Sequence, residues 1–334
     1  GPIGRVAATG TGIVSFPGVK KGESDLPANA ETGGYILEPL KTPNKVIGVI
    51  KVGWSGWKND LPEEDTRLLK TLASTIALVL ENATLYKEHL EKEHMEEELK
   101  IAWDIQHSCL PSSPPQRLTD NLAATTLPAR IVGGDYYDFF DLDGSRTGIA
   151  IADVAGKGIP AALLMIMLRT VLRALELKTS EAARVMNSLN VLLTGEMDPY
   201  RFITMQYAII DPEKGTVTLS NAGHEPLLIW RKNRSVFDEI HVIGIPLGID
   251  NEFQFGETEV PVESGDLLVF YTDGVVETQN LQKEFWGHEN FRKLISECAD
   301  LPVKDILDRI VDELKRFCGD EPQYDDISLL IFKV

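Results

Sequence analysis

Four acidic positions share one setting, in which a carboxylate stands at the end or edge of an apolar, strand-like run. They are Asp135 after two glycines, Asp153 in "GIAIADVAGKG", Asp273 in "LLVFYTDG", and the pair Asp325 and Asp326 that opens "DDISLLIF". Carboxylates gathered at one rim of a sheet repel one another unless a cation lies between them, and hard divalent ions favour all-oxygen ligands. A single Asp-Gly is also a common turn. Four such positions in one region nevertheless favour a site for Mn²⁺ or Mg²⁺.

The glycine-rich stretch "DVAGKGIPAALL" could cradle a phosphate at a helix start. It lacks the GxxxxGK[ST] spacing of a nucleotide P-loop, which argues against a nucleoside triphosphatase. Its glycines more simply allow a tight turn after Asp153, so that a peptide carbonyl can face a metal. Pro160 then begins a helix at a position where proline is tolerated.

Composition excludes several classes of function. A hydrophobic content of 43% and a charged content of 25% are typical of a globular protein with real cores. The formal charge of −18 argues against nucleic acid as a partner, because such binding needs Lys and Arg to neutralise phosphates. Cys109, Cys298 and Cys318 show no CxxC spacing, so we expect neither a thiolate zinc site nor disulfides, and a cytoplasmic setting. No apolar run reaches about 18 residues without charge, so no membrane segment is expected.

A strand-and-helix pattern positions the acids. "PSSPPQ" opens this region, and strands are predicted in "LAATTLPARI", "GIAIADV", "FITMQYAIID", "TVTLSNAG", "PLLIWR", "DLLVFYTDG" and "DISLLIFKV". Helices are predicted in "PAALLMIMLRTVLRALEL", "SEAARVMNSLNVLLTG" and twice over residues 288–317. Strands grouped around paired helices predict an α+β sandwich with an antiparallel core, rather than a doubly wound parallel sheet.

One long helix is predicted before this region, with Pro62 at its start and Pro111 after its end. Its apolar positions step by three and four residues, as in a coiled-coil seam: Leu69, Leu72, Ile76, Val79, Ala83, Tyr86 and Leu90. The spacing fails at Glu93 or His94 and resumes at Met95, Leu99, Ala102 and Ile105, where such a helix can bend or change partner. Packing on its own domain would explain the first half as well. The length of the seam favours a dimerising connector, with a parallel homodimer through residues 65–105.

The first 60 residues are rich in Gly and Pro, and "NKVIGVIKVGW" is their clearest strand. The opening "GPIGRVAATG" has strand-and-turn composition without a helix or cap before it. We therefore expect the chain to begin inside a folded unit, with further sequence upstream.

Five separated motifs, "GGDYYDF", "DVAGKGIPAALL", "NAGHEP", "LVFYTDGVVE" and "QYDDISLLIF", resemble in order and spacing the SpoIIE-like branch of the metal-dependent PPM protein phosphatases. "DIQHSCLP" is similar to the segment that enters this domain, so the resemblance covers residues 100–334. The stretch from the opening to "GYILEPLKTPNKVIGVIKV" more loosely resembles the latter part of a GAF sensory domain. The resemblance implies a partial GAF-like α/β domain (1–62), a connector helix (63–110), and a PPM-type αββα sandwich of two packed antiparallel sheets flanked by helices (111–334).

The resemblance also implies a centre of two Mn²⁺ or Mg²⁺ ions. Asp153 would bridge both ions and the Val154 carbonyl would also ligate, while Asp135 would serve one ion directly or through water. Gly133 and Gly134 would clear space so that Asp135 can approach the centre.

The remaining site residues follow from the same resemblance. Asp273 and Asp325 would hold the other metal, and Asp326 would support these ligands rather than bind directly. Arg130 lies five residues before Asp135, the offset of a phosphate-binding arginine in related phosphatases, although a surface role fits it equally.

The motif "NAGHEP" has two interpretations. His224 could act as an acid or base, but a tight turn between two strands explains the motif as well, and we favour a structural role. Glu225 stands where the family usually has proline, which affects the expected shape of that loop and not the metals.

The reaction implied is hydrolysis of phosphoserine or phosphothreonine on a regulatory partner, of the anti-sigma-factor-antagonist type, by a metal-activated water and without a covalent phosphoenzyme. The GAF-like part would regulate it through the connector. A non-catalytic interaction module is one alternative, and the intact acids argue against it. A small-molecule phosphohydrolase is another, with the same centre. The sequence leaves the sensory ligand, the direction of regulation, the metal used in cells and the individual substrate open.

Overall fold

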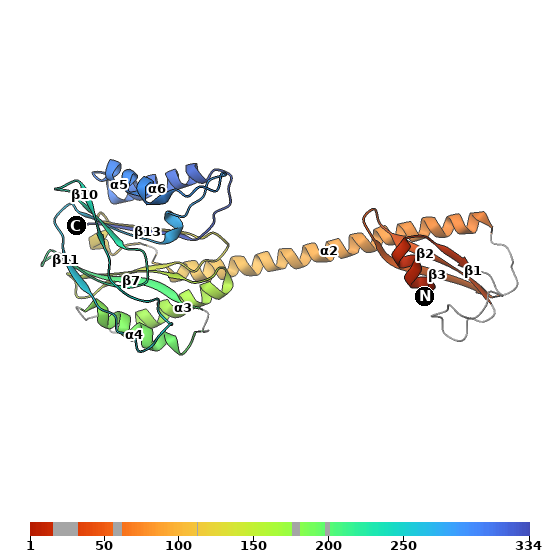
Figure 1. Ribbon diagram of the computed structural model, residues 1–334, viewed down its shortest axis with the longest axis horizontal. Helices are drawn as coiled ribbons and strands as arrows, with labels where there is room; N and C mark the ends of the chain where they lie inside the picture. The colour runs from red at the N-terminus through yellow and green to blue at the C-terminus, as the bar shows by residue number, and fades with distance from the viewer. Residues whose placement is uncertain (16–32, 56–61, 112, 176–180, 198–200) are drawn as a thin grey trace. The chain divides into compact units, whose positions relative to one another are not determined.

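The computed structural model describes residues 1–15, 33–55, 62–111, 113–175, 181–197 and 201–334 (Figure 1). These residues divide into two compact units, Gly1–Glu97 and Glu98–Val334. The helices are α1 (Pro2–Thr9), α2 (Glu63–Cys109), η1 (Gln116–Leu118), α3 (Ile159–Ala174), α4 (Ala182–Thr194), η2 (Asp273–Val275), α5 (Gly287–Cys298) and α6 (Val303–Cys318). The strands are β1 (Ile13–Ser15), β2 (Gly33–Lys41), β3 (Val46–Ser55), β4 (Leu122–Leu127), β5 (Tyr136–Asp141), β6 (Thr147–Val154), β7 (Ile203–Asp211), β8 (Thr216–Ala222), β9 (Leu227–Arg231), β10 (Val236–Ile240), β11 (Thr258–Pro261), β12 (Leu267–Tyr271) and β13 (Ile327–Lys333).

The first unit contains an antiparallel sheet in the order β1-β2-β3. β2 and β3 are paired along their length, from Gly33 opposite Ser55 to Lys41 opposite Val46. The N–H group of Thr42 donates to the carbonyl of Lys45, three residues later, at 2.9 Å and closes the hairpin. The strand predicted in "NKVIGVIKVGW" is β3, and that prediction is confirmed.

The opening of the chain is a helix, so the expectation of strand-and-turn composition there is wrong. Pro2 stands in the first turn of α1, where its missing N–H removes no helical hydrogen bond. Val6 is the buried residue of the helix, and two alanines follow it. Gly10 ends α1 at φ 63° and donates its N–H to the Val6 carbonyl at 2.9 Å. The glycines that suggested turns therefore cap or flank a short helix.

The long helix predicted before Pro111 is present as α2, which has 47 residues. Glu63, Glu64 and Asp65 occupy its first turn, where carboxylates interact favourably with the positive end of the helix dipole. Leu69, Ala73 and Ala77 are buried, which is a spacing of about one helical turn. This buried stripe shares only Leu69 with the predicted seam.

Most of the seam is exposed. Val79 is 60% and Tyr86 65% exposed, and Leu72, Ile76 and Leu90 are between 37% and 46%. Apart from Leu69, the predicted seam is thus uncovered in the single chain. An 18-residue window of α2 also has a mean hydropathy of 1.3 with no more than two charged residues, so by length and composition alone this helix could cross a membrane.

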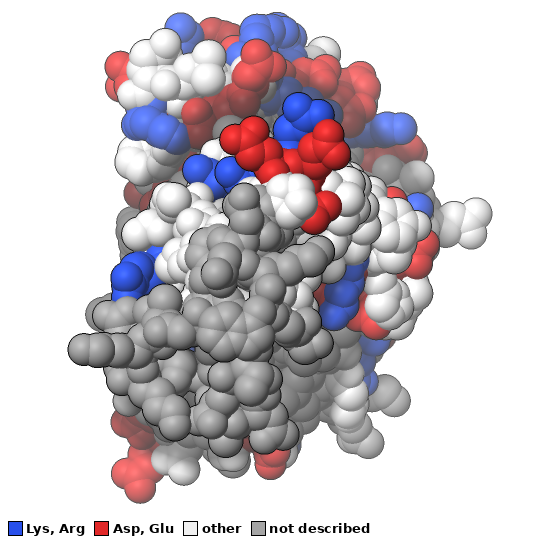
Figure 2. All heavy atoms as spheres, turned by 90° about the vertical axis from the view of Figure 1, so that its right-hand side faces the viewer, with Lys and Arg blue, Asp and Glu red and all other residues white. Residues whose placement is uncertain are grey.

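Charged side chains of both signs are interspersed among uncharged ones on the face of the molecule that Figure 2 presents. Where that face shows described residues, acidic and basic side chains lie near one another. Where charges of both signs are mixed, their fields largely cancel at a distance, so electrostatic effects are considered below for individual sites.

The second unit contains two five-stranded antiparallel sheets, in the orders β10-β9-β12-β13-β4 and β11-β8-β7-β6-β5. Alternate side chains of the central strands point to different cores. On β6, for instance, Ile149 and Ile151 enter the core between the sheets, while Ala150 and Ala152 enter the core beneath α3 and α4. α5 and α6 cover the outer face of the other sheet (Figure 1). The predicted αββα sandwich is confirmed.

The predicted helices and strands of this unit are present among the described residues, and the parts of two predicted helices that fall on residues 176–180 lie outside them. Some strands were not predicted. β10 and β11 lie at the edges of the two sheets, where a strand has a neighbouring strand on one side only and is less buried. β11 ends at Pro261, which suits an edge strand because proline lacks the N–H for a second partner. Partial burial gives such strands weak apolar alternation, so their sequences carry little signal.

Candidate metal centre

Asp153 and Asp135 lie at the same end of two neighbouring strands. Asp153 is the penultimate residue of β6 and pairs with Thr204 of β7. Asp135 comes directly before β5, whose first residue, Tyr136, is opposite Ala152. The antiparallel pairing therefore brings the start of β5 beside the end of β6, and the two acids with it.

Asp273, Asp325 and Asp326 occupy the corresponding rim of the other sheet. One residue, Thr272, separates Asp273 from the end of β12, and Asp325 and Asp326 directly precede β13. β12 and β13 pair with Tyr271 opposite Leu329, so the end of one strand lies beside the start of the next. A Cβ atom on Gly274 would lie 1.9 Å from the Asp326 carbonyl oxygen, so this close approach requires glycine.

Hydrogen bonds join the two rims. The Thr272 hydroxyl donates to Oδ2 of Asp135 at 2.8 Å. The carboxylate of Asp326 accepts the N–H of Ala129 at 2.7 Å and that of Gly134 at 2.6 Å. The acids of one sheet are thereby fixed against the loop that carries Asp135. We call Asp135, Asp153, Asp273, Asp325 and Asp326 the five acids.

The electrostatics of the five acids are repulsive. Burial, and then the charges of Asp273, Asp325 and Asp326, raise the pKa of Asp153 to about 7. Burial, and then the charges of Glu277, Asp325 and Glu225, raise the pKa of Asp273 to about 6. Burial and the charges of Asp153 and Asp326 hold the pKa of Asp135 well above its usual range. Such a set is stabilised by a bound cation.

The donor set fits a hard divalent cation, because every side chain in it supplies carboxylate oxygens. The Val154 carbonyl oxygen lies beside the same loop, 2.8 Å from where a Cβ atom on Gly134 would stand. Among the described residues, no three acidic, histidine or cysteine side chains already converge as ligands of one ion. Binding would draw the carboxylates inward from these positions.

The two glycines before Asp135 have a more specific reason than clearing space for that side chain. A Cβ atom on Gly133 would lie 2.4 Å from Oδ2 of Asp326, and one on Gly134 would meet the Val154 carbonyl. Both glycines therefore let the loop approach Asp326 and the end of β6. Asp135 is positioned by this approach.

Arg130 and His224 lie near the centre in sequence or in space but differ in setting. Arg130 is exposed on the loop between β4 and β5. Nδ1 of His224 is 2.8 Å from the Thr204 hydroxyl, opposite Asp153 across the β6 and β7 pairing. Burial lowers the pKa of His224 to about 4, so the ring is neutral at physiological pH. These contacts agree with the structural role favoured for His224.

Three residues that the sequence analysis missed contact the site. Lys157 forms an ion pair with Asp325 at 2.9 Å, and Thr272 donates to Asp135. Gln106 of α2 donates to the Gly133 carbonyl at 2.6 Å and accepts the Gly133 N–H at 3.2 Å. Lys157 and Thr272 stand within a few residues of predicted ligands, and this proximity in the sequence could have identified them as candidates. Gln106 lies in the segment "DIQHSCLP", which the sequence analysis noted without giving this residue a role.

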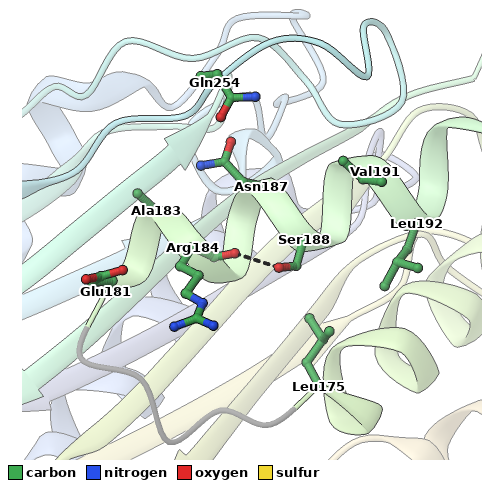
Figure 3. A pocket seen from close by; sticks show the side chains of 9 residues that line it. All are labelled: Leu175, Glu181, Ala183, Arg184, Asn187, Ser188, Val191, Leu192 and Gln254. Carbon is green, nitrogen blue, oxygen red and sulfur yellow. Dashed lines mark hydrogen bonds between the residues drawn. The ribbon is translucent and has the colours of Figure 1, made fainter.

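A hollow of about 690 Å³ lies over α4, between the end of α3 and the loop that carries Gln254 (Figure 3). Its lining includes Leu175, Arg184, Ser188 and Leu192, and none of the five acids. The Ser188 hydroxyl donates to the Arg184 carbonyl at 2.9 Å, as drawn in Figure 3. This hollow is separate from the candidate centre.

Comparisons with known proteins agree with this architecture. Residues 143–334 match the family model described as Stage II sporulation protein E (SpoIIE), and residues 3–82 match a GAF domain model. The chain is 29% identical over 301 residues to phosphoserine phosphatase RsbU of Bacillus subtilis (strain 168), which covers 89% of this chain and 88% of RsbU.

Two solved structures are also similar. The SiaA-PP2C domain of Pseudomonas aeruginosa has a TM-score of 0.65 at 20% identity, covering 73% of this chain and 98% of that one, a likeness of fold. The RsbU and RsbW domains of Rv1364c from Mycobacterium tuberculosis have a TM-score of 0.56 at 25% identity, covering 64% of this chain and 59% of that one.

Proposed function

The chain belongs to the Stage II sporulation protein E family, and on that premise we propose that it is a metal-dependent phosphatase that removes phosphate from serine or threonine of a regulatory protein. Protein serine phosphatase activity follows from this membership and from the similarity to RsbU. In the proposed organisation, residues 1–62 form a GAF-like sensory domain, 63–110 a connector and 111–334 the phosphatase domain.

One observation carries the proposal: five carboxylates from two sheets share a site in which burial and neighbouring negative charges raise the pKa values of Asp135, Asp153 and Asp273. A chain that only bound a partner would gain nothing from this arrangement, since buried carboxylates without a cation destabilise the fold. A dinuclear Mn²⁺ or Mg²⁺ centre would neutralise these carboxylates, which explains why they are gathered in one site.

The residues of the chain would divide the work as follows. Asp153 would serve both ions and the Val154 carbonyl would be a further ligand, while Asp273 and Asp325 would hold one ion and Asp135 the other. The chemistry supplied by such ions is activation of a water molecule for attack on phosphorus and neutralisation of charge on the phosphoryl oxygens. Thr272 and Asp326 would hold Asp135 and its loop in place through their hydrogen bonds.

The substrate in this proposal is a phosphorylated anti-sigma-factor antagonist in the cytoplasm. The length over which the chain is similar to RsbU supports this class of substrate, because the similarity includes the segments before the phosphatase domain. The match of residues 3–82 to a GAF model supports regulation by a ligand or partner.

The proposal includes a parallel homodimer through residues 65–105. The exposed side chains of Ile76, Val79 and Tyr86 support it, because an uncovered apolar stripe along a helix is stabilised by packing against an identical stripe. A parallel pair would place both phosphatase domains at the same end of the connector.

The test compares two substrates with the full chain in the presence of Mn²⁺. A phosphoserine-bearing anti-sigma-factor antagonist is one, and p-nitrophenyl phosphate is the other. We expect kcat/KM to be higher for the phosphoprotein, and both activities to disappear in EDTA. Equal rates on both substrates would favour a small-molecule phosphohydrolase, and no hydrolysis of either with Mn²⁺ would contradict the proposal.

A further inference from the structure

Lys157 contacts the rim of the candidate centre from the loop between β6 and α3. Its Nζ atom is 2.9 Å from Oδ2 of Asp325 and donates to the Tyr324 carbonyl. The same ammonium lies over the Tyr324 ring, 4.4 Å from the centroid. Three interactions thus hold one positive charge beside a carboxylate of the centre.

This charge is unusual in its surroundings. Among the described residues, the ion pair between Lys157 and Asp325 is the one ion pair in which one of the five acids takes part. A phosphoserine carries a charge of about −1.5 to −2 at neutral pH, so it is repelled by the acids it must approach. An ammonium at the rim reduces that repulsion and offers hydrogen bonds to a phosphoryl oxygen.

The side chain is also able to move. Lys157 is 33% exposed, and its neighbours Gly156 and Gly158 have positive φ angles of 108° and 77°. A Cβ atom on either glycine would meet nothing within 4 Å, so the loop is open on that side. Tyr324 is 54% exposed and can keep its ring against the lysine stem when the ammonium turns outward.

We propose that Lys157 is a phosphate-binding residue, whose ammonium group leaves Asp325 and binds a phosphoryl oxygen of the substrate when a divalent cation occupies the centre. The inference rests on the proposed function. A divalent cation and the ammonium both favour Asp325 and repel each other, so the cation displaces Lys157 from that carboxylate. The phosphoryl group then provides the negative partner that Asp325 no longer offers.

Two consequences have opposite signs. Without the ammonium, Asp325 is freed from a competing cation, so the affinity for Mn²⁺ rises. Binding of the phosphorylated substrate loses a charge-assisted hydrogen bond, so KM rises. A lysine that only stabilised the loop would, on removal, weaken both metal binding and substrate binding.

The experiment uses the full chain with Lys157→Met and Lys157→Arg. Calorimetric titration with Mn²⁺, without substrate, gives the metal affinity, and steady-state rates on the phosphoprotein give KM and kcat separately. Inorganic phosphate, tested as an inhibitor, reports on the phosphate site alone. Lys214→Met is the matched control, because Lys214 also lies near an aspartate, Asp211, but in the turn between β7 and β8.

For Lys157→Met we expect about threefold tighter Mn²⁺ binding, and about tenfold increases in KM and in the inhibition constant of phosphate. Lys157→Arg should restore most of KM, and Lys214→Met should change none of these values. Unchanged KM, or weaker Mn²⁺ binding, in an active Lys157→Met enzyme would overturn the inference alone. A wild-type chain that binds no Mn²⁺ and hydrolyses no phosphoprotein would overturn the proposed function first, and this inference with it.

Discussion

At the scale of single residues, Asp153 combines burial with three neighbouring negative charges. Asp273 has a similar setting at the end of β12, and Asp135 is held by the Thr272 hydroxyl. Their side chains contribute little to the apolar cores, which lie on either side of the sheets. Function and packing can therefore be separated by substitution at these positions.

We expect Asp153→Asn and Asp273→Asn each to lower metal-dependent kcat at least about a hundredfold, because each removes a charged ligand and several kcal/mol of transition-state stabilisation. Circular dichroism spectra should be unchanged, since the amide has nearly the same shape as the carboxylate. Near-wild-type activity of either variant at saturating Mn²⁺ would sink the assignment of the centre.

The raised pKa values predict how the stability of the metal-free protein depends on pH. Folding favours the protonated form of a carboxyl group whose pKa is raised, so its stabilisation is complete below the usual Asp pKa of about 4 and is lost as pH rises through the folded value of about 7 for Asp153. In EDTA, Asp153→Asn should therefore be more thermostable than wild type at pH 8.

The difference should shrink towards pH 4, because wild-type Asp153 is then neutral as well. Its size is roughly 2–4 °C in Tm for each kcal/mol of repulsion removed. Thermal melts in EDTA between pH 4.5 and 8 measure it. A Tm difference that does not change with pH would show that repulsion at Asp153 is not its cause.

At the scale of secondary-structure elements, the end of α2 is bound directly to the site. The buried amide of Gln106 forms a reciprocal pair of hydrogen bonds with Gly133, two residues before Asp135. About one helical turn after Gln106, the carbonyl of Cys109, the last residue of α2, accepts a hydrogen bond from Arg169 of α3. A rotation of α2 would therefore move the loop of Asp135 and the helix that follows Asp153.

We expect Gln106→Ala to weaken Mn²⁺ binding about tenfold, the effect typical of losing a group that orients a ligand. It should also lower the free energy of unfolding by about 1–3 kcal/mol, because both backbone groups of Gly133 lose their partner in a buried position. Calorimetry and denaturant titration measure the two effects. Ser108→Ala, at an exposed position of the same helix turn, is the control. An unchanged Mn²⁺ affinity in Gln106→Ala would argue against this coupling.

At the scale of the whole molecule, the exposed apolar seam along α2 leads us to predict association of two chains. The seam residues are exposed in the single chain, and burying them against a second copy would remove apolar surface from water. If two packings of the seam have nearly equal energy around its break near His94, association of the connector can switch the activity.

We predict that Ile76→Glu with Val79→Glu yields a monomer with altered specific activity, because charges in the seam oppose packing. Substitutions at Lys87 or Glu91, which form only an exposed ion pair at 3.7 Å, should change neither property by much. Sedimentation measured alongside phosphatase rate decides between a switch and a passive tether. A monomeric variant with unaltered turnover would show that the seam is only structural. A wild-type chain that is monomeric and binds lipid vesicles would show that the seam contacts a membrane and not a second copy.

The sequence by itself determined the central strands, the longer helices and the acids at the strand ends. A continuous apolar run is a local property, so β6, β12 and β13 and the carboxylates beside them could be located without a structure. Prolines and acids likewise marked both ends of α2. The same local reasoning failed at α1, because glycines that cap a short helix look like turn residues in isolation.

Only the tertiary structure decided which groups satisfy and position the acids. The hydrogen bond from Gly134 to Asp326 joins residues 192 positions apart, and that from Thr272 to Asp135 joins residues 137 apart. Gln106 reaches Gly133 across 27 positions and from a different element. A buried polar group must find a partner, but which partner it finds depends on the segments that packing brings alongside it. No spacing along the chain encodes that choice.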